Sequence, residues 1–126
     1  MFATCLRKMA IAQAALLCAL VFAGFATLQA ADFNHARDLV ARVQNDLQRA
    51  ADFTRTNEKE RVRYENVQHH LSEFDRDLSH DHFDKGKLDA SIDNLKDIVK
   101  KNTLESHDRD ALAADLSDLR TLRDTR

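Results

Sequence analysis

The residues best suited to chemistry in this 126-residue chain are its six histidines. His35 stands three positions after Asp32, and His80 stands three positions after Asp77, with His82 close behind. An aspartate and a histidine at this spacing lie on one face of a helix, where both can bind the same ion. Imidazole and carboxylate together suit Zn²⁺, Cu²⁺ and Ni²⁺. The pattern therefore predicts a metal site formed by Asp32, His35, Asp77, His80 and His82.

Two other interpretations of these histidines stay open. They can belong to a solvated, polar end of a helical bundle that holds no ligand. They can also form a pH-sensitive patch, because several imidazoles gain protons together near about pH 6. His69 and His70 are adjacent, so they cannot both face a core, and we expect them at the surface or its boundary.

The motifs of the common enzyme classes are missing from the sequence. It contains no Gly-x-Ser-x-Gly, no His-Glu-x-x-His and no glycine-rich phosphate loop. It contains no Cys-x-x-Cys-His for haem, and no glutamate stands three residues before a histidine, as di-iron bundles require. Cys5 and Cys18 both precede residue 31, so the remainder has no thiolate. We predict a protein that is not an enzyme and has no cofactor other than the candidate metal ion.

A segment typical of a secretory leader opens the chain. Arg7 and Lys8 precede an uncharged apolar stretch, 9–28, and small residues follow it. We favour a signal peptide over 1–30 with cleavage after Ala30. The alternative is an uncleaved N-terminal anchor, because the stretch approaches the ~20 residues that span a bilayer. Both place the remainder in the periplasm or outside the cell, with membrane contact only through an uncut leader.

The charge of the chain bears on its partners. Removing Arg7 and Lys8 with the leader leaves 17 of the 19 basic residues against 21 acidic ones, a net charge of −4. Binding to nucleic acid is dominated by neutralisation of phosphates, so a mildly acidic chain predicts no nucleic-acid partner. We expect an unidentified protein partner or self-association instead.

Four amphipathic segments must position these side chains. In the first two, large and small apolar residues recur at alternating steps of three and four, which places them on one helical stripe. The stripes are Phe33, Ala36, Val40, Val43, Leu47 and Ala50; Tyr64, Val67, Leu71, Phe74 and Leu78; Leu88, Ile92, Leu95 and Val99; and Leu112, Leu116, Leu119 and Leu122.

Polar residues mark the helix ends. Asn57 and Glu60 form the pattern of a capping box, 84–86 separates the second and third segments, and Ser106 is expected to cap the fourth. Residues 31–126 hold one glycine, Gly86, and no proline, so short turns join consecutive helices. The sequence predicts an all-α, antiparallel up-down helical bundle of about four helices after an N-terminal signal peptide. Two long helices with the rest packed loosely, or a dimer that completes the core, are the alternatives.

This topology brings the candidate ligands to one end of the bundle. The start of the first helix and the turn between the second and third helices meet there, so His35 is expected near His80 and His82. Asp81 and Asp84 supply further carboxylates at this end.

Two stretches of the sequence resemble small exported bacterial helical-bundle proteins of unknown function. They are Phe-Asp-Lys-Gly-Lys-Leu-Asp at 83–89, and Asn-Thr-Leu at 102–104 followed by Arg-Asp-Ala-Leu at 109–112. The resemblance implies no active residues. The chain is also similar in size and location to exported helical chaperones of envelope stress, whose Leu-Thr-x-x-Gln repeats it lacks. We therefore expect a non-enzymatic protein that is chaperone-like, envelope-structural or otherwise acts by protein interaction. The alternative is a periplasmic divalent-metal-binding protein using the His/Asp cluster.

Overall fold

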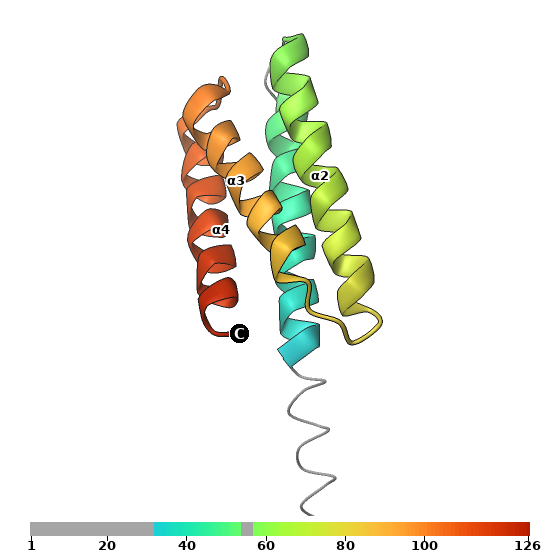
Figure 1. Ribbon diagram of the computed structural model, residues 1–126. Helices are drawn as coiled ribbons and strands as arrows, with labels where there is room; N and C mark the ends of the chain where they lie inside the picture. The colour runs from blue at the N-terminus through green and yellow to red at the C-terminus, as the bar shows by residue number, and fades with distance from the viewer. Residues whose placement is uncertain (1–31, 54–56) are drawn as a thin grey trace, which may run out of the picture. The chain divides into compact units, whose positions relative to one another are not determined.

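The structure is a computed structural model that describes residues 32–53 and 57–126. These residues form four helices that pack against one another, without a strand (Figure 1). The first helix occupies 32–53, followed by α2 (Glu58–Leu78), α3 (Lys85–Lys101) and α4 (Ser106–Asp124). The all-helical prediction is confirmed. The predicted signal peptide, its cleavage point and both cysteines lie outside the described residues.

The four helices enclose one apolar core. The predicted stripes of the first helix and α2 are buried almost throughout, and Phe33 packs on the edge of the core. In α3 the core takes Ile98 rather than Val99, which is only partly buried. Each helix keeps a polar face, and within the described residues none is both long and apolar enough to cross a membrane.

Polar contacts between neighbouring helices join early residues of one helix to late residues of the other. Lys87 in α3 contacts Asp77 in α2 at 2.6 Å, whereas Arg63 near the start of α2 contacts Asn102 just after α3 at 2.9 Å. The first helix follows the same rule with α2 through Arg37–Asp75, and Gln44–Ser72 joins the middle parts of the two helices. The α3–α4 pair does so through Arg123–Asp89. The contacts fix how each helix is aligned along its neighbour.

The helix ends are set by their capping residues. The predicted capping box of α2 is confirmed: the Glu60 N–H donates to Asn57 Oδ1 at 3.0 Å, and the Asn57 N–H donates to a Glu60 carboxylate oxygen. Asp84 caps α3, so Gly86 lies inside the first turn of the helix rather than in a separating loop. The prediction that Ser106 caps α4 is wrong. The N-cap is Glu105, whose carbonyl accepts from the Arg109 N–H at 2.9 Å.

Candidate functional site

The turn between α2 and α3 gathers the only group of metal-ligating side chains found in the described ranges. Asp77, His82 and Asp84 each offer one ligand atom, and these atoms all lie within 4.8 Å of one another. We call these three residues the turn cluster. It joins Asp77 and His82, two of the five predicted ligands, with Asp84, which the sequence offered as a further carboxylate at this end of the bundle.

The backbone of the turn folds around Asp77. The Asp77 carbonyl accepts from the N–H groups of both His80 and His82, each at 3.0 Å. Between them, Asp81 takes a left-handed conformation with φ of 57°, which an aspartate tolerates better than most residues. This reversal returns the chain over the end of α2, so that the side chain of His82 lies near that of Asp77.

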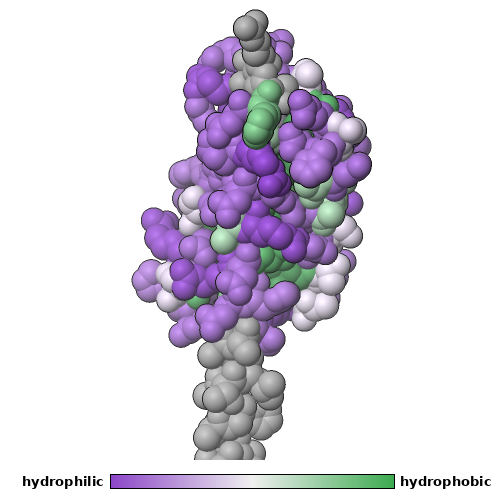
Figure 2. Space-filling view, turned by 180° about the vertical axis from the view of Figure 1, so that it is seen from behind, coloured by the Kyte–Doolittle hydropathy of each residue, from purple (hydrophilic) through white to green (hydrophobic). Residues whose placement is uncertain are grey.

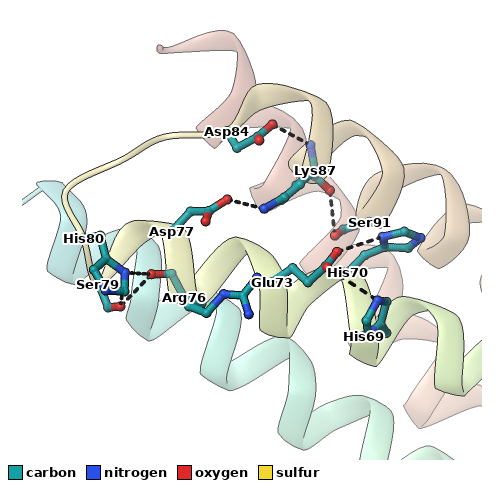
Figure 3. Close-up of polar contacts among 10 residues, drawn as sticks. All are labelled: His69, His70, Glu73, Arg76, Asp77, Ser79, His80, Asp84, Lys87 and Ser91. Atoms are coloured by element: carbon teal, nitrogen blue, oxygen red, sulfur yellow. Dashed lines mark hydrogen bonds and ion pairs between the residues drawn. The ribbon is translucent and has the colours of Figure 1, made fainter.

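Lys87 from α3 neutralises part of the turn cluster. Its ammonium lies 2.6 Å from Asp77 Oδ2, and its backbone N–H donates to Asp84 Oδ1 at 3.0 Å (Figure 3). The hydrogen bond from Lys87 lowers the pKa of Asp77, although partial burial opposes the change. The same bond raises the pKa of Lys87. An ion entering the turn cluster must therefore compete with an ammonium group that is already in place.

The other predicted ligands are not part of the turn cluster. The His80 imidazole turns back to the end of α2, where Nδ1 lies 2.8 Å from the Arg76 carbonyl (Figure 3). His35 lines a cavity of about 430 Å³ between the first helix and α4. Asp32 is an exposed residue of the first helix. Among the described residues, the group within metal-binding distance contains none of these three.

The donor set of the turn cluster is one imidazole and two carboxylates, which suits borderline divalent ions such as Zn²⁺, Cu²⁺ and Ni²⁺. Ligand atoms around a tetrahedral zinc stand roughly 3.3 Å apart, given bonds of about 2.0–2.1 Å. The ligand atoms of the turn cluster lie within 4.8 Å of one another, and His82 is exposed. The three donors would have to close from within 4.8 Å to this spacing to bind one ion.

His69 and His70 lie at the surface and its boundary, as expected, and both contact Glu73. His69 Nε2 is 3.6 Å from one Glu73 oxygen, and His70 Nδ1 is 3.9 Å from the other (Figure 3). These are pairs along one helix face of the kind that stabilise exposed helices modestly.

A buried polar group at the opposite end of α2 was not predicted. Glu60 is 4% exposed and accepts from the Thr103 backbone N–H at 2.7 Å and from the Thr103 hydroxyl at 3.0 Å. The neighbouring Asn102 is also buried and receives Arg63 on its side-chain oxygen. Arg109 from α4 donates to the Asn102 carbonyl. The group ties the starts of α2 and α4 to the end of α3, which is a structural role.

Carboxylates are also buried between the first helix and α4. Asp115 is 2% exposed, and Arg42 Nε donates to its Oδ1 at 3.1 Å. Arg42 also binds Asp118, and Arg49 binds Asp46 and approaches Asp108. The sequence carried a signal for this arrangement. Asp108 and Asp115 stand at steps of four and three around Leu112, on the same stripe as the α4 leucines.

Comparisons with known proteins identified no similar protein. No protein-family model matches the chain, and no curated protein or solved structure matches it. The interpretation of the turn cluster therefore depends on its own geometry.

Proposed function

We propose that the chain is an exported, non-enzymatic protein, built as an antiparallel up-down bundle, that acts by binding another protein through its surface. The contacts that align early residues of each helix with late residues of the next support this topology. The observation that carries the binding role is the exposure of Phe53, 71% of whose surface is accessible.

The surface around this end of the bundle supports the binding role. Within the described ranges, Val62 is the other exposed large apolar side chain, at 41%, and it lies in the first two turns of α2. A hollow of about 340 Å³ opens nearby between the first helix and α2, with Leu47, Ala51 and Tyr64 in its wall. Figure 2 shows a largely hydrophilic face interrupted by small hydrophobic patches. Apolar side chains that remain exposed beside a hollow mark interaction sites more often than scattered single ones.

Capture from the native envelope tests this role. We expect crosslinking and affinity capture with the protein to retain one defined partner, and the variant Phe53→Ser/Val62→Ser to lose it. The matched control is Lys59→Ser, an exposed change in the same turn of α2, which should retain the partner. Equal capture by the double variant would contradict the proposed surface. A turnover activity lost on a single polar substitution would contradict the non-enzymatic role.

The second candidate function is binding of a divalent metal ion at the turn cluster. The observation that favours it is the convergence of Asp77, His82 and Asp84 within 4.8 Å. Because Lys87 already holds Asp77, a physiological ion would have to bind strongly enough to displace the ammonium group. Among the first-row divalent ions, Cu²⁺ has the highest affinity for such nitrogen and oxygen donors.

Calorimetry with Zn²⁺, Cu²⁺ and Ni²⁺ on the tag-free protein tests the metal site. We expect one of these ions to bind with a Kd below about 10 μM, equivalent to roughly 7 kcal/mol. His82→Ala and Asp84→Asn should each weaken binding at least about tenfold. Lys87→Met should strengthen it, because the competing ammonium is removed.

The matched controls separate the structural site from the set predicted by sequence. His35→Ala and His80→Ala remove predicted ligands that lie outside the turn cluster, and both should bind as the unmodified protein does. Metal binding that survives His82→Ala but is lost in His69→Ala/His70→Ala would contradict the turn cluster and assign the ion to the exposed histidine pair.

A further inference from the structure

The cavity of about 430 Å³ between the first helix and α4 takes no part in the surface or the metal site proposed for the chain. We call it the seam cavity. Leu39 and Leu122 line it and still expose 7% and 8% of their surface, whereas most members of the apolar core expose 2% or less. Sites for small molecules occupy roughly 300–1,000 Å³ and are mostly apolar, so the seam cavity has the size and the floor that a small ligand needs.

The register of the two helices explains why a cavity lies here. Arg42 Nε lies 3.1 Å from Asp115 Oδ1, and Arg49 Nε lies 3.8 Å from Asp108 Oδ1. A step of seven residues forward along the first helix therefore corresponds to a step of seven back along α4. The same step in the other direction reaches His35, and there α4 presents a leucine to the seam cavity. A leucine cannot form a third ion pair, so the space between the helices is left open.

The charges at the seam cavity are unbalanced. Arg42 lines the cavity, but its guanidinium already binds both Asp115 and Asp118. Asp38 lines the cavity too and is exposed, and within the described ranges it has no hydrogen bond or ion pair. Together these four side chains carry three negative charges and one positive charge. An excess of negative charge in a cleft attracts cations.

The other polar groups of the wall can accept hydrogen bonds. The hydroxyls of Thr121 and Thr125 donate to backbone carbonyls of their own helix, so their oxygens remain acceptors. His35 is exposed, and a neutral imidazole has one acceptor nitrogen. An ammonium group donates up to three hydrogen bonds and accepts none, so it matches this set of carboxylate, hydroxyl and imidazole acceptors.

Other classes of small ligand fit the seam cavity less well. Among the described residues, the side chains that converge closely enough for a metal ion are those of the turn cluster, not those of this cavity. The described wall contains no Phe, Tyr or Trp, so it offers none of the rings on which aromatic or quaternary cations stack. An alkyl chain can cover leucine side chains while its ammonium group stays in water, as lysine side chains do.

We propose that the seam cavity binds a linear aliphatic polyamine, with one ammonium group at Asp38 and the alkyl chain on Leu39 and Leu122. The wall residues span 35–42 on the first helix and 118–125 on α4, which is about 10 Å along each helix axis. Spermidine has as many backbone bonds as three extended residues and therefore spans about 10 Å. Its length matches that of the cavity.

NMR titration of the tag-free protein with spermidine at low ionic strength tests the site. We expect saturable shifts of the amide signals of 35–42 and 118–125, with a Kd below about 100 μM. Asp38→Asn should weaken binding about threefold to fivefold, because it removes an exposed charge that meets the ligand. Thr121→Lys should abolish the shifts, because it places an ammonium group from α4 itself in the cavity.

Asp93→Asn is the matched control, because it removes the same charge from an exposed position of α3 outside the cavity. This variant should bind spermidine as the unmodified protein does. Equal weakening by Asp93→Asn and Asp38→Asn would overturn the proposal, because the net charge of the chain would then account for the binding. Equal shifts of the same signals with Mg²⁺, or no shift of these signals at about 1 mM spermidine, would also overturn it.

Discussion

Replacing Phe74 with alanine is expected to lower the free energy of unfolding by about 3–5 kcal/mol. Phe74 is fully buried, and its ring packs edge-on against Phe83 with 5.3 Å between the ring centroids. Alanine would leave a cavity at this position. The surrounding helices also pack against one another, so they cannot move inward far enough to fill it. Because small domains have about 5–15 kcal/mol of stability in total, the midpoint of urea unfolding, followed by circular dichroism, should fall sharply.

The exposed phenylalanine provides the control for this result. Phe53→Ala removes the same ring from a side chain that is 71% exposed, and the loss should stay within about 0.5 kcal/mol. Similar losses in the two variants would mean that Phe53 is covered in solution, for example by a second copy of the chain. A dependence of the urea midpoint on protein concentration would then be expected.

Replacing Glu60 with alanine is expected to produce the second large loss, about 1.5–3 kcal/mol, because a buried carboxylate that accepts three hydrogen bonds, two from Thr103 and one from the Asn57 N–H, is removed. The Thr103 backbone N–H is the main cause that lowers the pKa of Glu60. The contribution of the ionised Glu60 carboxylate to stability is therefore present at neutral pH, and it is lost as the pH falls through the lowered pKa of Glu60. Urea unfolding of both proteins at neutral pH and below about pH 4 measures this difference.

Glu58→Ala is the matched control for Glu60, since Glu58 lies in the same turn, is 73% exposed and pairs with Arg61 at the surface. We expect no measurable loss of stability from it, because exposed ion pairs contribute little. A Glu60 variant as stable as the Glu58 variant, or a loss that persists unchanged at acid pH, would contradict the role given to the Glu60 carboxylate.

Apolar periodicity predicted the helices because the core is the main reason that they pack. The stripe of α2 repeats at steps of three and four from Tyr64 to Leu78, and each of its apolar members is buried. The boundaries depended on single capping groups. The capping box at Asn57 has a specific two-residue pattern and was predicted, whereas Glu105 caps α4 through its backbone and leaves no such pattern.

The buried polar residues were not predicted, because the periodicity was searched for among apolar residues only. Asp115 stands on the α4 stripe between Leu112 and Leu119, and its partner Arg42 is far away in sequence. The pattern alone could not show that an arginine would meet it. Two of the five candidate metal ligands, Asp77 and His82, lie in the turn cluster, whereas His35 does not. The topology placed His35 at the expected end of the bundle, but the rotation of the first helix directs it to a cavity beside α4.

The arginines of the first helix also have a consequence for the choice among alternative folds. The apolar stripe repeats almost every seven residues, so sliding the first helix by one heptad would bury nearly the same apolar surface. The ion pairs between the helices would be broken by this shift. Arg42 would leave Asp115 and Asp118 behind, and a buried carboxylate without its cation costs several kcal/mol. The ion pairs between the first helix and α4 therefore specify the register of the two helices. They destabilise misaligned bundles that would bury a similar apolar core.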